Sequence, residues 1–304
     1  MLRVKPNVIV AGAHGLLGYN LVVQLKENFD VIALDIAIKD ELCVEGVDYL
    51  PADITSQKEM TELVKKHHPR YIFNAAAYTN VDGAETEREL CWKINVEGVA
   101  SLAHAARVYG SRLVHVSTDY IFDGDHGPYR ESNRPDPLGY YGKSKLAGEN
   151  ALMSSGANWA IGRTMVLYGY APGARLNFIT WMVEQLRQSK PIRIVDDQFG
   201  NPTLASDLAS ALIKLAVSSR EEIYHLCGSE IIDRYHLALL VADVYGLDSS
   251  LITRIKTSDL GQAAKRPLNS GFIIEKAEKE LGVEMLDARG GIEQLKVEIE
   301  KAQS

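Results

Sequence analysis

The fold of this chain is decided by the stretch Val8-Ile9-Val10-Ala11-Gly12-Ala13-His14-Gly15-Leu16-Leu17-Gly18. Its apolar first part is typical of a buried strand, and its glycines lie where that strand turns into an apolar helix. There the first glycine permits a tight turn, the second lets the backbone approach a pyrophosphate, and the third lets the helix pack on the sheet. The helix N-terminus adds amide donors for phosphate. The stretch predicts a dinucleotide-binding turn, whereas a turn without a ligand would need only one packing glycine.

An acidic residue, Asp35, ends the second apolar run, at about the distance where dinucleotide sites place a ribose-binding carboxylate. Such a carboxylate accepts from the 2′-hydroxyl of NAD and repels the 2′-phosphate of NADP. Unit charges about 4 Å apart at an effective dielectric near 20 interact by roughly 4 kcal/mol. The expected cofactor is therefore NADH or NADPH, with NADH favoured by Asp35. NADPH stays open, because the repulsion is lost if Asp35 turns away or if Lys39 folds in to hold the phosphate.

Short apolar runs alternate with helix-length amphipathic segments in the first half of the chain. The runs are Val8 to Val10, Val31 to Leu34, Tyr71 to Phe73, Leu113 to Val116 and Trp159 to Gly162. The expected helices are Leu16 to Glu27, Ser56 to His67, Thr86 to Tyr109 and Gly139 to Ser154. Ser56 with Glu59 predicts a capping box, and Gly110 predicts a left-handed helix end. This rhythm predicts the α/β class, with a doubly wound Rossmann-type parallel sheet in an NAD(P)-binding domain at residues 1–168.

Beyond Gly169 the pattern is less regular, and amphipathic segments follow one another without a clear strand between them. They are Asn177 to Gln188, Ser206 to Val217, Tyr235 to Tyr245 and Ile292 to Lys301. We expect residues 169–304 to form mainly a smaller α/β substrate-binding region. Whether some of its segments return to the Rossmann sheet is left open by the sequence.

Composition excludes several classes of function. The chain has 304 residues, 46% of them hydrophobic, and a net charge of −7, so no basic surface is expected for a nucleic acid or an anionic membrane. Cys43, Cys91 and Cys227 form no C-x-x-C pair, which predicts neither a disulfide framework nor a zinc site. No apolar run reaches the length of a membrane span. A cytoplasmic protein with a small-molecule substrate is expected, and a homodimer stays open.

Tyr141 and Lys145 are spaced to lie on one helix face, roughly 5 to 6 Å apart at Cβ. A nearby ammonium favours phenolate, so Lys145 is expected to lower the pKa of Tyr141 from its ordinary value of about 10. Thr118, after the apolar run, can hydrogen-bond a carbonyl that Tyr141 protonates. With 14 tyrosines such a pair arises by chance roughly once, and then it would be an exposed helix pair. Its position after a strand favours a proton-transfer site.

Four further strings make the chain resemble the dTDP-4-dehydrorhamnose reductase family of the extended short-chain dehydrogenase/reductase superfamily. The strings are NAAAYTNVD at residues 74–82, STDYIFDG at 117–124, DQFGNPT at 197–203 and RPLNS at 266–270. The resemblance covers nearly the whole chain and implies NAD(P)H-dependent reduction of the C4 ketone of a dTDP-4-dehydro-6-deoxy sugar. The favoured reaction is dTDP-4-dehydrorhamnose to dTDP-L-rhamnose, in dTDP-rhamnose biosynthesis for cell-wall polysaccharide.

The resemblance also implies site residues, with Tyr141 as proton donor, Lys145 on the nicotinamide ribose and Thr118 on the carbonyl. Cofactor-binding residues are expected at Gly12, His14, Gly15, Leu16, Leu17, Gly18, Asp35, Asp53, Ile54, Ala75, Ala76, Ala77, Tyr78, Tyr141 and Lys145. Substrate-binding residues are expected at Thr118, Asp119, Tyr120, Val166, Asn177, Phe178, Gln198, Asn201, Pro202, Thr203 and Arg266. No metal ligand is expected.

Several of these assignments have a plain structural alternative. Asp53 can cap a helix, the three alanines can serve helix packing, and Arg266 can form a salt bridge instead of holding a diphosphate. We expect Asp196 and Asp197 to belong to a loop before Gln198 rather than to a metal site.

One departure from the family pattern concerns the sugar. The family commonly has Trp where this chain has Val166, which would soften an aromatic wall of the sugar pocket. The alternatives are a nucleotide-sugar epimerase or dehydratase with tightly bound NAD, and a non-catalytic NADP-binding regulatory subunit.

Overall fold

Seven parallel strands form the central sheet of the computed structural model, which describes residues 5–303. The strand order is β11-β6-β5-β4-β1-β2-β3, and each pair of neighbours runs parallel. The bounds are β1 Asn7–Ala11, β2 Asp30–Asp35, β3 Asp48–Pro51, β4 Tyr71–Asn74, β5 Arg112–Thr118, β6 Asn158–Thr164 and β11 Ile223–His225. The order reverses between β1 and β4, which is where open α/β sheets bind ligands at the carboxyl ends of their strands.

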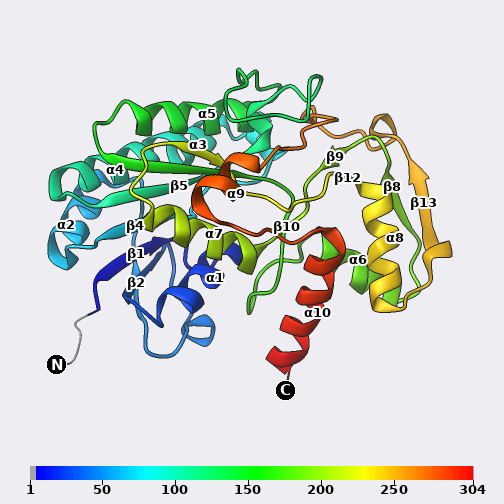
Figure 1. Cartoon of the computed structure of the whole chain (residues 1–304), viewed down its shortest axis with the longest axis horizontal. Helices are drawn as coiled ribbons and strands as arrows, with labels where there is room; N and C mark the ends of the chain where they lie inside the picture. Colours follow the sequence, from blue (N-terminus) through cyan, green and yellow to red (C-terminus); the bar gives the residue numbers. More distant parts are fainter. Residues whose placement is uncertain (1–4, 304) are drawn as a thin grey trace.

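Helices cover both faces of this sheet, so the predicted doubly wound arrangement is confirmed (Figure 1). On one face lie α1 (Leu16–Leu25) and α7 (Ala205–Val217), which pack against each other. On the other lie α2 (Gln57–His67), α4 (Gly98–Tyr109) and α5 (Tyr140–Met153). Alternate residues of β1 enter the two separate cores below these layers. Burial on both faces explains why the strand sequences are continuously apolar.

The predicted helix ends are partly confirmed. Gly110 ends α4 with φ 73°, in the left-handed region. The Ser56 side chain accepts from the Glu59 amide, but the Glu59 carboxylate accepts from the amide of Asp53, so the capping box is only half formed.

The helix expected at residues 86–109 begins later and is interrupted. It consists of α3 (Arg88–Trp92), a π-helical turn at Lys93–Glu97 and then α4. The turn carries Asn95, whose buried amide accepts from the Tyr78 amide and donates to the Ser144 hydroxyl. π-turns inside helices are frequent at functional sites, and this one lies beneath the helix that carries Tyr141.

A smaller α/β region lies at the right of Figure 1, around its own apolar core. It contains a parallel pair, β8 (Ile192–Val195) with β13 (Ile252–Ile255), packed against α6 (Phe178–Arg187), α8 (Arg234–Tyr245) and α10 (Ala288–Gln303). Two short pairs complete it: β7 (Leu167–Tyr168) with β10 (Thr203–Leu204), and β9 (Phe199–Gly200) with β12 (Ile232–Asp233).

Segments after residue 168 return to the Rossmann sheet. Strand β11 pairs with β6, α7 covers the same face as α1, and α9 (Glu275–Leu281) packs against α7 and β11. Within residues 5–303, no helix has the length and apolar character needed to cross a membrane.

Candidate active site

The glycine turn after β1 has the backbone geometry that its sequence predicts. Gly12 has φ 81°, and a Cβ there would stand 2.7 Å from the amide nitrogen of Ala76. A Cβ on Gly18 would stand 2.0 Å from the Gly12 carbonyl oxygen, so this glycine lets α1 lie against the turn. Gly15 caps α1 in an extended conformation and leaves the first amides of the helix without intrahelical partners. The turn therefore offers a glycine surface and free amides to a pyrophosphate.

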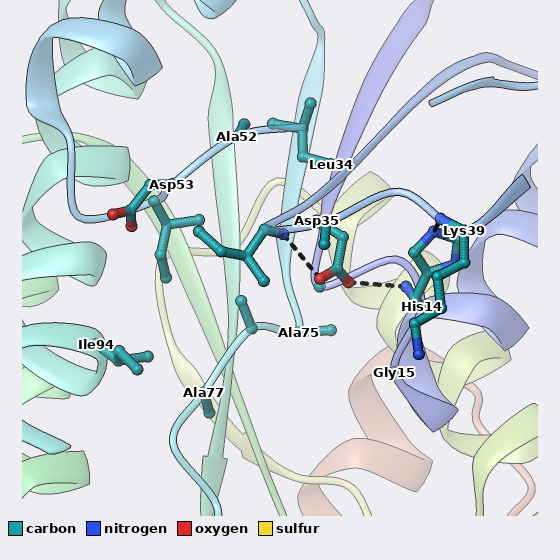
Figure 2. A pocket seen from close by; sticks show the side chains of 15 residues that line it. His14, Gly15, Leu34, Asp35, Lys39, Ala52, Asp53, Ala75, Ala77 and Ile94 are labelled. Atoms are coloured by element: carbon teal, nitrogen blue, oxygen red, sulfur yellow. Dashed lines mark hydrogen bonds between the residues drawn. The ribbon is translucent and has the colours of Figure 1, made fainter. Parts of the chain in front are cut away.

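A first cavity of about 510 Å³ opens beside this turn (Figure 2). The Asp35 carboxylate accepts from the His14 amide at 3.0 Å and from the Ile36 amide at 2.8 Å. Two backbone donors thus hold it at the cavity wall, and Lys39 lines the same cavity. The predicted cofactor residues among its lining are Gly12, His14, Gly15, Asp35, Asp53, Ile54, Ala75, Ala76 and Ala77.

A second cavity of about 530 Å³ shares Gly15 and the three alanines with the first. It is also lined by Leu16, Leu17, Thr118, Asp119, Tyr120, Tyr141, Lys145 and Val166. The structure therefore brings the predicted Thr, Tyr and Lys together at the carboxyl end of β5. Two cavities joined along the ends of β1 and β4, with a glycine turn between them, fit an elongated dinucleotide.

Lys145 is buried at 3% exposure. Its ammonium nitrogen Nζ donates to the Val116 carbonyl at 2.7 Å and lies 3.4 Å from Nε2 of His115. Burial lowers the pKa of Lys145 to about 8, because an apolar environment disfavours the charged form.

The expectation that Lys145 lowers the pKa of Tyr141 is wrong for this structure. Burial raises the pKa of the Tyr141 phenol, and the nearby Asp119 raises it further, while a hydrogen bond with Thr118 opposes the shift. The spacing of four places Lys145 on the correct face, but its amine is engaged by Val116 and His115. Loss of solvation is the larger effect on a buried phenol. The phenol is held in its protonated form, which is the form that can donate a proton.

The Thr118 hydroxyl donates to the Asp119 carboxylate at 3.1 Å and accepts from the Tyr120 amide at 3.3 Å. The other Asp119 oxygen accepts from the Ser270 hydroxyl at 2.6 Å, and burial raises the pKa of this carboxyl. Asp119 therefore joins the end of β5 to the RPLNS string more than 140 residues away.

A third cavity of about 380 Å³ shares Tyr120, Val166 and Leu167 with the second. Predicted substrate residues Tyr120, Val166, Phe178, Gln198 and Arg266 line it. Sequence reasoning missed Trp181, Arg193, Arg234 and Gln262, which also line it. Arg234 could have been found from the sequence, because it is a cation directly after Asp233. The Asp233 carboxylate caps α8 by accepting from two backbone amides.

Four residues predicted to bind substrate lie away from these cavities and serve the fold. Asn177 caps α6 and donates to the Gly169 carbonyl at 2.8 Å. Asn201 is buried, donates to the Gly228 carbonyl at 2.7 Å and accepts from the Phe272 amide at 2.8 Å. Thr203 donates to the Asn201 carbonyl and lies, like Pro202, outside the cavity linings. Because these groups are already paired within the protein, they have little to offer a ligand.

Two predicted cofactor residues also lie outside the linings. Gly18 serves helix packing, and the Tyr78 hydroxyl donates to Glu87 at 2.7 Å. That bond is the main reason why the pKa of Tyr78 rises to about 12.

Arg266 is ion-paired rather than free. Its guanidinium bonds the Asp82 carboxylate at 2.8 Å and lies over the Tyr120 ring, 5.9 Å from its centroid. The salt-bridge alternative is therefore present in this structure, although Arg266 still lines the third cavity.

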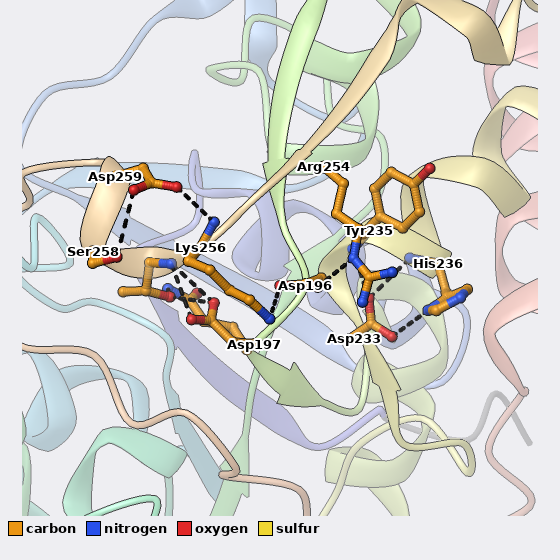
Figure 3. Close-up of polar contacts among 11 residues, drawn as sticks. Asp196, Asp197, Asp233, Tyr235, His236, Arg254, Lys256, Ser258 and Asp259 are labelled. Carbon is orange, nitrogen blue, oxygen red and sulfur yellow. Dashed lines mark hydrogen bonds and ion pairs between the residues drawn. The ribbon is translucent and has the colours of Figure 1, made fainter.

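The neighbouring aspartates Asp196 and Asp197 are engaged within the small region (Figure 3). Asp196 forms ion pairs with Arg254 and Lys256, and Asp197 accepts from the amide and hydroxyl of Thr257. These contacts hold the segment after β8 against the end of β13 and the residues that follow it. Among residues 5–303, no group of three or more His, Cys, Asp or Glu side chains could hold a metal ion.

Val166 has φ 47°, a conformation that a β-branched residue rarely adopts. Its carbonyl accepts from the Thr203 amide at 3.1 Å, which helps to fix the turn. The side chain lines both the second and the third cavity, so it stands at their junction. Trp181, stacked on Phe178 at 6.2 Å between ring centroids, supplies aromatic surface to the third cavity.

Comparisons with known proteins agree with this architecture. The family model described as RmlD substrate binding domain matches residues 6–300. A dTDP-4-dehydrorhamnose reductase of Aggregatibacter actinomycetemcomitans is 33% identical over 294 residues, covering 92% of this chain and 95% of that protein. The crystal structure of dTDP-4-dehydrorhamnose reductase from Bacillus anthracis in complex with NADP has a TM-score of 0.88 at 31% identity, covering 97% of this chain and 99% of that one. UDP-glucose 4-epimerase of Thermotoga maritima, at 19% identity and a TM-score of 0.84, shares the fold alone.

The glycine turn on a parallel sheet, together with one cavity that holds Thr118, Tyr141 and Lys145, defines an NAD(P)H-dependent oxidoreductase of the extended short-chain dehydrogenase/reductase class. The family match extends over almost the whole length of the chain. The chain belongs to the dTDP-4-dehydrorhamnose reductase family.

Proposed function

We propose that this enzyme reduces the C4 ketone of a dTDP-4-dehydro-6-deoxy sugar, with dTDP-4-dehydrorhamnose as substrate and dTDP-L-rhamnose as product. One observation carries the proposal: the cavity that holds Thr118, Tyr141 and Lys145 adjoins the first cavity at the glycine turn on one side and the third, cation-lined cavity on the other. This order suits a ketone presented between a nicotinamide and a nucleoside diphosphate. Relatives that match over most of the chain are dTDP-4-dehydrorhamnose reductases, which supports the same substrate.

The first cavity and the alanines of residues 75–77 would hold the dinucleotide, which supplies a hydride when bound. The chain supplies the proton. The buried phenol of Tyr141 is held protonated, so it can donate to the oxygen on which negative charge develops. The Thr118 hydroxyl would turn its proton from Asp119 to that oxygen and orient it. Lys145, charged below about pH 8, contributes positive charge at the same place.

The third cavity would hold the nucleotide part of the substrate. Arg234 and Arg193 line it and can pair with phosphate oxygens. Trp181, which is stacked on Phe178, offers a ring face on which a pyrimidine base can stack, while the Arg234 guanidinium lies over the Phe178 ring. Val166, at the junction of the cavities, would lie against the sugar.

The direct test is turnover. Purified protein given dTDP-4-dehydro-L-rhamnose should oxidise NADH or NADPH in equal molar amount to the sugar consumed. A lack of oxidation with both cofactors would contradict the proposal. Tightly bound NAD, together with conversion of a nucleotide sugar without net redox change, would instead indicate an epimerase or dehydratase.

The choice of cofactor is expected to depend on Asp35. Its carboxylate lines the first cavity and would repel a 2′-phosphate, so we propose NADH as the preferred reductant. Asp35→Asn removes the charge but keeps the shape of the side chain. It should raise the ratio of kcat/KM for NADPH to kcat/KM for NADH by at least about tenfold. The ratio is measured at saturating sugar.

A matched control for this change is Asp30→Asn, which removes a carboxylate from the exposed start of the same strand. It should leave the cofactor ratio unaltered. An unchanged ratio in Asp35→Asn would show that the carboxylate does not discriminate between the two cofactors.

A further inference from the structure

A buried line of hydrogen bonds runs from the alanine loop to the amine of Lys145. The Ala76 amide donates to Oδ1 of Asn74 at 3.2 Å, and Nδ2 of Asn74 lies 3.1 Å from Nδ1 of His115. Nε2 of His115 then lies 3.4 Å from Nζ of Lys145. Asn74 and His115 are 1% and 0% exposed, and neither lines the cavities described above. Neither residue was a candidate site residue from the sequence.

The direction of these bonds follows from counting donors. The Ala76 amide can only donate, so the oxygen of the Asn74 side chain must face it and the NH₂ group must face His115. A donor facing Nδ1 requires that Nδ1 carry no proton. A neutral imidazole then carries its proton on Nε2. Burial and the charge of Lys145 both lower the pKa of His115, which keeps the imidazole neutral.

The Nε2 proton of this tautomer points toward Nζ of Lys145. The lone pair of a neutral amine can accept the Nε2 proton. An ammonium has no lone pair, so its own hydrogens face the Nε2 proton and repel it. The Val116 carbonyl accepts from Lys145 in both protonation states, but it accepts more strongly from the ammonium, so it favours the charged form. Of the two hydrogen-bond partners of Lys145, only His115 favours the neutral amine.

We propose that Asn74 and His115 are positioning residues, which fix the imidazole with its Nε2 proton toward Lys145 and so favour the neutral amine over the ammonium. Together with burial, the pair makes Lys145 a group that exchanges its proton close to physiological pH, instead of a permanent cation. This role goes beyond the proposed function, because it does not depend on the substrate. It holds for any reaction in the same cavity.

Other titratable groups around Lys145 do not replace this effect. Glu149, one turn further along α5, favours the ammonium, but it is ion-paired with Arg163 of β6. Cys91 from α3 also acts in the direction of a charged lysine. Tyr141 lines the same cavity and is held neutral by burial. The lowered pKa of Lys145 therefore agrees with burial beside a hydrogen-bond donor.

The tautomer can be measured directly by long-range proton–nitrogen NMR on protein labelled with ¹⁵N-histidine. The His115 signal is assigned by its loss in His115→Gln. We expect a bare Nδ1 and a protonated Nε2 in the wild type, without titration between about pH 5 and 9. Asn74→Asp should reverse the tautomer, because a carboxylate accepts from Nδ1–H. Asn158→Asp, a control at the exposed start of β6, should leave it unchanged.

The effect on Lys145 is measured by following its ¹³Cε shift against pH, with Lys145→Met for assignment. We expect a midpoint near pH 8 in the wild type. His115→Gln can turn an amide oxygen toward the ammonium without adding a charge, so its midpoint should rise by about one pH unit or more. Asn74→Asp should raise it as well, and Asn158→Asp should not.

A wild-type His115 with its proton on Nδ1 would overturn the proposal, as would a Lys145 midpoint that stays in place in both Asn74→Asp and His115→Gln. Neither readout requires turnover. If the protein failed to reduce any keto sugar, the proposed function would fall while these two measurements would still decide the inference.

Discussion

Tyr141→Phe is expected to lower kcat for keto-sugar reduction by about 10²- to 10⁴-fold while cofactor binding is retained. The phenol lies in the central cavity and is held protonated by burial, so it is the group best placed to donate a proton to the developing alkoxide. Phenylalanine keeps the ring and its edge-to-face contact with Tyr120 but removes the proton. Steady-state kinetics and fluorescence titration with NADH measure the two quantities separately.

The adjacent tyrosine provides the control. Tyr140 is on the same helix, where its ring lies beneath the Arg88 guanidinium and outside the cavity lining. Tyr140→Phe should keep kcat within a few-fold of the wild type. Comparable losses in the two variants, or none in Tyr141→Phe, would contradict the role proposed for Tyr141.

The largest effect on stability is expected from the ion pair between Glu149 and Arg163. Two bonds of 2.9 and 2.7 Å join the carboxylate to the guanidinium, and the side chains are 0% and 3% exposed. Removing one partner leaves the other charge buried without compensation, which typically costs about 3 to 5 kcal/mol. Glu149→Ala should therefore reduce the free energy of unfolding by about that amount, as measured by urea denaturation.

An exposed pair with the same separation shows whether burial is responsible. Arg289 and Asp243 are also joined at 2.7 Å, but their side chains are 51% and 65% exposed. Asp243→Ala should cost no more than about 1 kcal/mol, because solvent screens such pairs. Similar losses in Glu149→Ala and Asp243→Ala would indicate that burial of the first pair carries no special penalty.

The features that follow from local chemistry were predictable from the sequence. Gly12 and Gly18 are needed because a Cβ at either position would strike backbone, and Gly110 is needed because its φ is positive. The alternation of apolar runs with helices likewise predicts a parallel sheet. By contrast, nothing in the sequence of β11 indicates which strand it pairs with, so its return to β6 could not be predicted.

The site, too, was predictable from the sequence only in part. Spacing places Tyr141 and Lys145 on one face, but it does not report how deeply they are buried, and burial reverses the expected shift in the pKa of the phenol. The string around Asn201 predicts importance without telling a ligand contact from a folding contact, and its side chain proves to be paired with Gly228 and Phe272. His115 reads as one residue of an apolar strand, and only the fold brings it to Lys145.

The proposed reaction transfers a hydride to C4 of a nucleotide-linked keto sugar. The most direct measurement follows deuterium from NADH carrying two deuterons at nicotinamide C4, with dTDP-4-dehydro-L-rhamnose as acceptor and NMR of the purified product. One deuteron is expected at C4 of the sugar in dTDP-L-rhamnose and none elsewhere on the ring. A product whose C4 carries only protium, or deuterium at another ring carbon, would contradict it.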